Sequence, residues 1–434
     1  MSDDTIHLVA GIDVGNGYVK GLITNTGTGV TDEIDMPSAA TSQSGSTPRV
    51  PEPDASAADL LGPGSDVDFY NRLDASIDSP LVSRADRKIF GRASLSVRGS
   101  GFSEFEVMGP HSKAEQELSK VLVLGTLAVK VLRDHVAATS ELPSGELAAD
   151  VHIGLALPIA EFVAKRHSYA AAFTGTPADP VTHLVTIKNF STPVRVRLSF
   201  IGVQVMAEGA SAQFAITDLG EPLAAGLLAD LRSRESDALP GVSPADLVAV
   251  RNTIGVDVGE GTVNLPTFTD GRFNAEASAT LGQGYGTALT NAMARMETAD
   301  PPLQFASRKQ LAAFLTAVPS ALQRGRYDRA AGFVTTEAGY LVEEIVSSFT
   351  DVLSQAGATT EAVYVYGGGA GPIKDQLYPA LAGAAGDIPV LYLDSTYSRN
   401  LNRQGLFLAA QAVAAATGAP TPIRTAKNKK HSAA

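Results

Sequence analysis

The stretch GIDVGNGYVKGLI, from Gly11 to Ile23, sets an aspartate and two closely spaced glycines within an apolar run. In a dinucleotide-binding fingerprint the glycines open a helix, whose amino terminus binds the pyrophosphate. Here the residues that follow, Tyr18 to Ile23, are β-prone and include no helix-capping residue. Asn16-Gly17 is also a strong signal for a two-residue hairpin turn, because both residues tolerate positive φ. The stretch therefore predicts a strand, a turn and a second strand, and the Rossmann interpretation fails.

A second copy of this pattern, GVDVGEGTVNLPTF, runs from Gly255 to Phe268. Backbone N–H groups in tight glycine turns form a concave site for phosphate oxygens, and two aspartates that face one another can hold the water shell of Mg²⁺. Either copy alone is more simply interpreted as an ordinary hairpin. The repeat favours a phosphate site, because six positions are identical: Gly11/Gly255, Asp13/Asp257, Val14/Val258, Gly15/Gly259, Gly17/Gly261 and Val19/Val263.

Two further glycine clusters accompany the hairpins. VYVYGGGAGPIKDQL places Gly367, Gly368 and Gly369 after an apolar strand, with Pro372 where a helix can start. Only glycine lets the backbone lie flat against a nucleobase or ribose, although a plain strand-to-helix turn is the alternative interpretation. LGQGYGTAL, which contains Gly284, predicts another turn before a helix, either beside a nucleotide or simply for close packing.

The composition excludes several classes of protein. A chain without cysteine has no disulfide and no thiolate metal site, and its seven scattered histidines argue against zinc. The formal net charge of −12 argues against broad contact with nucleic acid. No lysine precedes serine or threonine as a Walker loop requires. With no secretory signal and no apolar run long enough to span a bilayer, we expect a cytoplasmic protein that does not enter the membrane.

Strand-like and helix-like segments alternate along the chain, which indicates α/β layers. The segment 40–80 is rich in Ser, Pro, Gly and Asp, so we expect an inserted flexible loop there. The end of the chain, 419–434, gathers basic residues without core-forming ones, which predicts a disordered tail.

The two glycine hairpins, followed by YGGGA before a helix, resemble the actin-like ATPase superfamily of actins, the Hsp70 nucleotide domain and sugar kinases. Within it the chain is most similar to bacterial plasmid-segregation actins of the ParM/StbA type. ALPIAEF is similar to that family's LP-x-x-E-[FY] strand end, and VQVMAEGASAQF resembles its stretch leading to a glutamate that opens a helix. The resemblance runs in order from about Ile6 to Thr417, apart from the segment 40–80.

The resemblance implies an α/β protein with the actin-like ATPase fold, in which two ribonuclease-H-like domains flank a nucleotide cleft. We expect domain I over 1–205, with the inserted segment 40–80, and domain II over 206–397. A helix at 398–418 would return to domain I before the tail at 419–434.

The resemblance also implies roles for individual residues. The two turns would bind the phosphates of ATP or GTP, with Lys20 offsetting charge on the leaving phosphate and with Asp13 and Asp257 holding Mg²⁺ through water. The remaining glycines would face the nucleoside. The full set is Asp13, Gly15, Asn16, Gly17, Lys20, Asp257, Gly259, Gly261 and Thr262 for the phosphates, and Gly284, Gly367, Gly368 and Gly369 for the nucleoside.

Glu208 is the candidate for orienting the attacking water, since it follows a strand with apolar residues at Val203 and Val205. The alternative is a glutamate that favours a helix amino terminus through the macrodipole. The second hairpin departs from the family pattern in two places. Asn264 stands where many relatives have an aspartate, and Pro266 should confine its strand to an edge or a bulge.

The resemblance implies a cytomotive filament that assembles with ATP or GTP bound and hydrolyses it afterwards. Its partners would be further copies of the chain and a small DNA-binding adaptor on centromere-like DNA, so that no direct contact with nucleic acid is needed. The main alternative is a monomeric kinase for a sugar or another metabolite. A chaperone, a membrane-attached division actin and a non-hydrolysing filament fit less well, and the sequence does not distinguish ATP from GTP.

Overall fold

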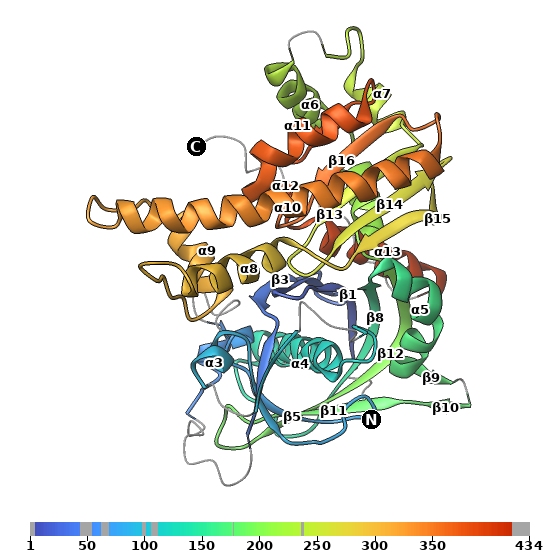
Figure 1. The fold of residues 1–434 in the computed structure, drawn as a ribbon. Coiled ribbons are helices and arrows are strands. Elements are labelled where there is room, and N and C mark those ends of the chain that lie inside the picture. Colours follow the sequence, from blue (N-terminus) through green and yellow to red (C-terminus); the bar gives the residue numbers. More distant parts are fainter. Residues whose placement is uncertain are drawn as a thin grey trace.

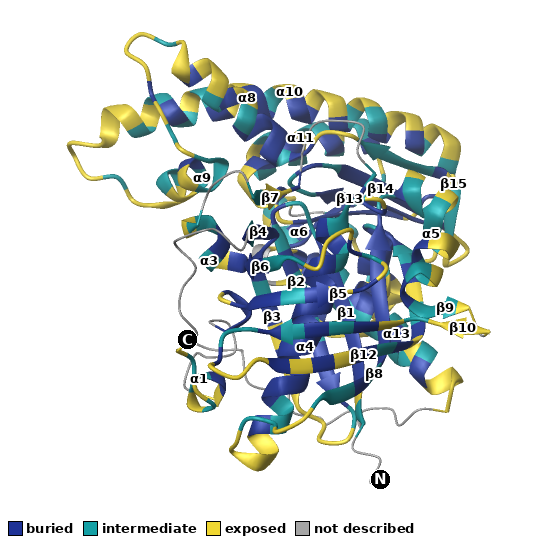
Figure 2. Cartoon of the chain, turned by 90° about the horizontal axis from the view of Figure 1, so that it is seen from below, coloured by how far each residue is buried: buried dark blue, intermediate teal, exposed yellow. Residues whose placement is uncertain are grey.

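A computed structural model describes residues 5–43, 54–61, 69–97, 101–105, 112–176, 178–235 and 238–418. Within these residues, strands and helices alternate along the chain and form two lobes, each built on a sheet of its own (Figure 1). The strands are largely buried, and the exposed residues gather on outer helices and loops (Figure 2). The predicted α/β class is confirmed.

The sheet of the first lobe has ten strands in the described part of the chain, and two of its pairings at the centre are parallel. The parallel pairs are β1 with β8 and β8 with β12, while the other pairs are antiparallel. In spatial order the strands are β3 (Thr31–Pro37), β2 (Tyr18–Asn25), β1 (Ile6–Val14), β8 (Leu147–Leu157), β12 (Val194–Ala207), β11 (Thr182–Ile187), β5 (Asp74–Asp78), β6 (Arg87–Phe90), β4 (Ala39–Gln43) and β7 (Phe102–Glu104).

The sheet of the second lobe repeats the arrangement of the first five of these strands. Its order is β15 (Arg272–Leu281), β14 (Val263–Thr269), β13 (Thr253–Val258), β16 (Ala362–Tyr366) and β17 (Val390–Tyr392). As in the first lobe, a meander of three antiparallel strands continues into two parallel strands. The repeated sequence motif therefore lies at the same place in two sheets of the same local topology.

The helices cover these sheets and join them. The longest, α10 (Arg324–Ala356), packs across the second sheet with α8 and α11 (Figure 1). The others are α1 (Ala58–Leu61), α3 (Gly91–Ser96), α4 (Glu117–Thr139), α5 (Ile159–Thr174), α6 (Ala210–Arg234), α7 (Pro244–Ala249), α8 (Tyr285–Glu297), α9 (Arg308–Thr316), η1 (Gly371–Ile373), α11 (Lys374–Ala385), α12 (Ser395–Ser398) and α13 (Leu401–Ala416). A separate short pair, β9 (Gly175–Thr176) and β10 (Asp179–Pro180), follows α5.

The helix α13 returns from the second lobe to the sheet of the first. It packs on β1 so closely that a Cβ atom on Gly11 would lie 2.2 Å from the backbone nitrogen of Phe407. A Cβ on Gly154 of β8 would likewise lie 2.1 Å from the carbonyl oxygen of Leu406. Both glycines are therefore needed for the approach of this helix, because any side chain would collide with its backbone.

The expectation of an inserted flexible loop over 40–80 is wrong for the described residues of that segment. The strands β4 and β5 lie within it or at its border and pair with β6 in the large sheet. Composition misleads here because these strands are short and flanked by Ser, Pro and Gly, while partners distant in sequence supply their hydrogen bonds. Residues 44–53 and 62–68 lie outside the described residues, as does the expected tail at 419–434.

The helix α4 carries buried charges into the core of the first lobe. Lys130 is fully buried and forms ion pairs with Asp134 at 2.5 Å and with Asp32 at 3.4 Å. Arg133 forms a further ion pair with Asp32, which also accepts a hydrogen bond from Tyr70 at 2.8 Å. This network ties β3 to α4 through paired charges, which is the condition under which charges are tolerated inside a protein.

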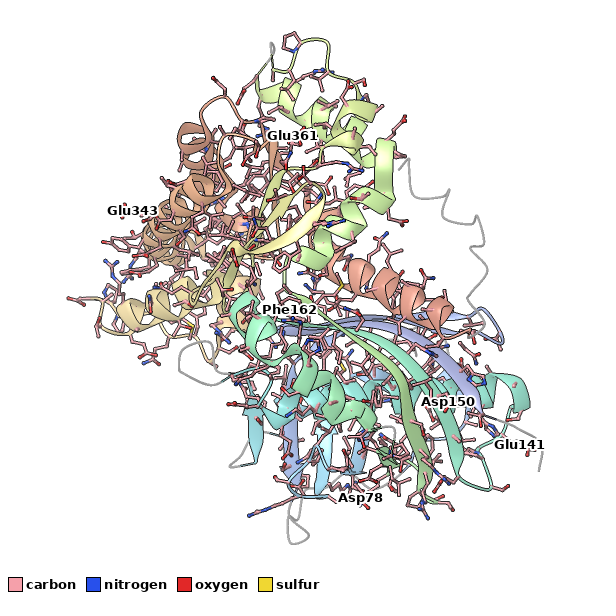
Figure 3. The ribbon with its side chains drawn as sticks, turned by 90° about the vertical axis from the view of Figure 1, so that its right-hand side faces the viewer. Asp78, Glu141, Asp150, Phe162, Glu343 and Glu361 are labelled. Carbon is pink, nitrogen blue, oxygen red and sulfur yellow. The ribbon has the colours of Figure 1, made fainter. Side chains whose placement is uncertain are left out.

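Aromatic contacts link the two lobes away from the glycine turns. Phe162 of α5 lies at the junction of the lobes (Figure 3), with its ring centroid 5.8 Å from that of Phe273 of β15. Phe273 in turn contacts Phe268 of β14, at 5.9 Å between centroids. The helix that follows β8 therefore packs directly on the sheet of the other lobe.

Candidate functional site

The two predicted hairpins are present and close in the same way. The backbone N–H of Gly15 donates to the carbonyl of Tyr18 at 3.0 Å, and that of Gly259 donates to the carbonyl of Thr262 at 2.9 Å. Asn16 and Gly17 lie between the hydrogen-bonded pair Gly15 and Tyr18, as the hairpin signal indicated, but neither residue has positive φ. The glycines are needed for close approach and not for a left-handed backbone.

The two turns interlock across the gap between the lobes. A Cβ atom on Gly17 would lie 1.5 Å from Oε2 of Glu260, a residue of the second turn. Conversely, a Cβ on Gly261 would lie 1.8 Å from Nδ2 of Asn16 in the first turn. Each turn thus places the end of one polar side chain against a glycine of the other, and the absence of a Cβ atom at Gly17 and Gly261 leaves room for it.

The other glycine clusters pack on the second turn. The backbone N–H of Tyr285 donates to the carbonyl of Gly259 at 3.0 Å, which sets Gly284 against the same turn at the start of α8. Gly369 donates to the carbonyl of Val258 at 2.8 Å.

Within the triple glycine, each residue meets a different environment. Gly367 has φ +96°, in the left-handed region that favours glycine, and a Cβ there would lie 2.5 Å from Oδ1 of Asp257. At Gly368, in contrast, a Cβ would meet no described atom within 4 Å. Three of the four predicted nucleoside glycines, Gly284, Gly367 and Gly369, therefore line the second turn, and Gly368 faces open space.

Buried charged groups gather behind the turns. Asp13 and Lys20 face each other as neighbours in register on β1 and β2. Burial lowers the pKa of Lys20, although the charges of Asp13 and Asp257 act to raise it. Burial raises the pKa of Asp257 to about 7, and the negative charges of Asp13 and Glu208 add to this effect. Three neighbouring carboxylates in a buried site would stabilise a bound cation.

Asp257 is oriented by a residue that the sequence interpretation missed. Asn402 of α13 donates from Nδ2 to Oδ2 of Asp257 at 2.8 Å, and Ser211 donates to Oδ1 of Asn402 at 2.8 Å. Asn402 is 145 residues away from Asp257 along the chain. No local motif marks it, because its role depends on the return of α13 to the centre of the molecule.

Glu208 lies directly after β12, at the end of the strand that faces the turns. Its backbone N–H donates to the carbonyl of Leu157 at 2.8 Å, which continues the parallel pairing with β8. Its carboxylate forms an ion pair with Lys113 and accepts a hydrogen bond from Nδ2 of Asn264 at 3.2 Å. Asn264, flagged as a departure in the sequence, is therefore a donor where an aspartate would repel Glu208.

Pro266 lies inside a strand that has neighbours on both sides. The pairing of β14 with β15 shifts its register between Leu265 and Thr267, which marks a bulge. A proline has no N–H to donate, so the irregularity removes the need for a ladder hydrogen bond at this position. We expected Pro266 to lie at a sheet edge or at a bulge, and it lies at a bulge.

Two basic residues at the start of α9 also face the turns, although no local motif marks them. Nζ of Lys309 donates to the carbonyl of Gly17 at 3.4 Å and lies 4.8 Å from the centroid of the Tyr18 ring. Arg308 forms an ion pair with Glu260 at 3.2 Å. Its Nη1 atom is buried, and no described residue accepts a hydrogen bond from it.

A cleft of about 560 Å³ opens beside these residues, between α8 and α9 of the second lobe and α3 and β7 of the first. This volume is within the range of about 300–1,000 Å³ that is typical of small-molecule sites. The lining residues are Leu95, Phe102, Glu104, Phe105, Glu260, Thr290, Met293, Ala294, Glu297, Ala306, Ser307, Arg308 and Lys309.

Across the described ranges, no group of three or more His, Cys, Asp or Glu side chains is placed to ligate a metal ion directly. In the same part of the chain, no helix is both long and apolar enough to span a bilayer.

Comparisons with known proteins give matches in structure alone. No family model matches the sequence, and no curated protein matches it. A non-polymerisable quadruple mutant of pCBH ParM is similar with a TM-score of 0.57 and 15% identity, covering 94% of this chain and 99% of that one. The archaeal actin homologue Ta0583 has a TM-score of 0.56 at 13% identity, with 94% and 100% covered. ParM of Bacillus thuringiensis with ATP has a TM-score of 0.54 at 14% identity, with 94% and 98% covered.

These likenesses extend over nearly the whole of both chains, and at such low identity they show the fold. The protein has an actin-like fold. More particularly, the arrangement is that of ParM proteins and of the archaeal actin homologue, as the sequence resemblance implied.

Proposed function

We propose that this protein is an ATP- or GTP-hydrolysing actin-like protein that assembles into filaments. The observation that carries the proposal is the meeting of the two glycine turns, with Asp13 and Asp257 behind them on opposite lobes. Domain I would comprise residues 1–205 together with the helix in 398–418, and domain II residues 206–397. The nucleotide would lie between them.

The residues at the turns fit a nucleotide with Mg²⁺. Burial raises the pKa of Asp257 to about 7, and a cation nearby would stabilise the ionised carboxylate. The buried Nη1 atom of Arg308 lacks an acceptor among the described residues, and a phosphate or ribose oxygen would supply one. When bound, Mg²⁺ would neutralise charge on the phosphates, with Asp13 and Asp257 holding its water shell.

In the proposed hydrolysis, Glu208 lies where it can act on the attacking water. The oxygen of a water molecule bonds to the γ-phosphorus, the bond from that phosphorus to the β–γ bridging oxygen breaks, and the protons of the water leave with inorganic phosphate. Glu208 would orient the water by accepting a hydrogen bond. Lys20 and the N–H groups of the two turns would offset charge on the leaving diphosphate.

Assembly is supported by the fold and by the surface. One of the similar structures is a non-polymerisable mutant of pCBH ParM, a description which implies that pCBH ParM itself polymerises. In this chain, Val318 and Leu322 lie in the loop between α9 and α10 and are each 93% exposed. We propose that a further copy of the chain covers these two side chains in the filament. We propose plasmid or other DNA segregation in the cytoplasm, through a DNA-binding adaptor, as the use of the filament.

The test is high-speed sedimentation with light scattering, with and without Mg²⁺ and ATP or GTP, alongside a non-hydrolysable analogue. Nucleotide-dependent pelleting that persists longer with the analogue is the expected result. If the protein binds nucleotide but never pellets, filament assembly is refuted and a monomeric metabolite kinase becomes the better assignment.

A further inference from the structure

The carboxylate of Glu208 is held at both of its oxygens, by one donor from each lobe. Lys113 of the first lobe forms an ion pair with Oε1. Asn264 of the second lobe donates to Oε2 at 3.2 Å. The amide of Asn264 is itself oriented, because the hydroxyl of Thr280 donates to its Oδ1 at 2.8 Å. The plane of the carboxylate is therefore set from two sides of the gap between the lobes.

Lys113 owes its own position to Glu161 of α5. The Glu161 carboxylate accepts hydrogen bonds from the backbone N–H groups of Lys113 and Ala114, both at 2.9 Å, and from the hydroxyl of Ser112 at 2.7 Å. Hydrogen bonds to an ionised carboxylate are about twice as strong as neutral ones. Glu161, the glutamate of the ALPIAEF stretch, thus anchors the segment that delivers Lys113 to Glu208.

A buried lysine at position 113 destabilises the protein unless its charge is paired. Its side chain is only 8% exposed, and burying an ammonium group without a compensating charge is strongly unfavourable. Burial lowers the pKa of Lys113, but the charges of Glu208 and Asp13 outweigh burial and leave the pKa raised. An apolar side chain of similar volume would fill the same space without this cost. Packing alone therefore does not account for the lysine.

We propose that Lys113 is a positioning residue for hydrolysis, which holds the Glu208 carboxylate in the orientation that accepts a hydrogen bond from the attacking water. This inference rests on the proposed nucleotide hydrolysis. Lys113 acts through Glu208 and needs no contact with the nucleotide. Misplacing a reacting group by about 1 Å can cost about 100-fold in rate, so loss of Lys113 should lower kcat and leave nucleotide affinity unchanged.

The experiment compares Lys113→Met, Lys113→Arg and the control Lys120→Met in the full-length chain. Lys120 lies in the first turns of α4, seven residues after Lys113, and has no contact with Glu208 among the described interactions. Phosphate release at saturating Mg·ATP gives kcat, and a fluorescent ATP analogue gives Kd. We expect kcat of Lys113→Met to fall about 100-fold, Lys113→Arg to recover part of the loss, and Lys120→Met to match the parent.

A double variant separates positioning from a general loss of structure. If Lys113 acts through Glu208, Lys113→Met adds little to the loss already caused by Glu208→Gln, because the two residues work as a unit. Additive losses overturn the inference, as does parental kcat in Lys113→Met or a fall in affinity that parallels the fall in kcat. If the parent protein binds nucleotide but hydrolyses neither ATP nor GTP, the proposed function fails first, so the two failures are distinguishable.

Discussion

Replacing Asp257 by asparagine should stabilise the protein without nucleotide while weakening its binding of Mg·ATP. Burial raises the pKa of Asp257 from 3.8 to about 7 in the folded state. Above pH 7 the carboxylate is therefore ionised in both the folded and the unfolded protein, and the buried charge destabilises the folded protein. The two pKa values differ by about three units, each worth about 1.4 kcal/mol, which gives about 4 kcal/mol.

The sign of the pH dependence follows from the direction of the shift. Between pH 3.8 and about 7 the unfolded chain loses the proton and the folded protein keeps it, so stability falls as the pH rises. Asparagine does not ionise, so it removes this fall in stability, and its side-chain oxygen can still accept the hydrogen bond from Asn402. The expected gain in the free energy of unfolding is about 4 kcal/mol at pH 8 and about 1.5 kcal/mol at pH 5.

Urea denaturation at pH 5 and pH 8, followed by circular dichroism, measures both gains. The matched control is Asp78→Asn, which changes an exposed carboxylate of β5 (Figure 3). A gain that is equal at the two pH values, or a loss of stability at pH 8, would refute the reasoning. In parallel, titration with Mg·ATP should show weaker binding for Asp257→Asn, and unchanged affinity would remove the aspartate from the nucleotide site.

Three further predictions follow from the contacts. Gly284→Ala should weaken nucleotide binding, because its Cβ would lie 2.7 Å from the backbone carbonyl oxygens of Gly259 and Glu260 and displace the second turn; calorimetry that shows the parental Kd contradicts this. Lys130→Met should destabilise the first lobe by about 3–5 kcal/mol, because it leaves Asp134 buried without its cation, and a cost below about 1 kcal/mol in urea denaturation argues against the pairing. Glu208→Ala should slow phosphate release at least about 100-fold while sedimentation with ATP persists; release at the parental rate would show that another group orients the water.

The two hairpins illustrate what can be predicted from local sequence. Apolar runs around Asp13 and Asp257, with glycines at fixed spacing, predict both strand pairs, and the strands form where expected. Asn16 and Gly17 tolerate positive φ, but neither residue adopts it, and Gly17 and Gly261 instead lie where the two turns meet.

The segment 40–80 shows the opposite limit. Its Ser, Pro and Gly content is typical of a loop, yet β4 and β5 belong to the large sheet. A strand with weak intrinsic preference forms when partners elsewhere in the chain supply hydrogen bonds and a surface to pack on. Residues near β4 and β5 in the sequence do not indicate which distant strands will pair with them.

By itself, the sequence determined the α/β class, the duplicated hairpins and the position of Glu208 at a strand end, because each follows from residue patterns only a few positions long. The tertiary structure decided which distant residues meet them. Lys113 and Asn264 reach Glu208 from two lobes, and Asn402 reaches Asp257 from the last helix. These partners are separated by between 56 and 145 residues, so only the folding of both sheets around a shared centre brings their charges within hydrogen-bonding distance.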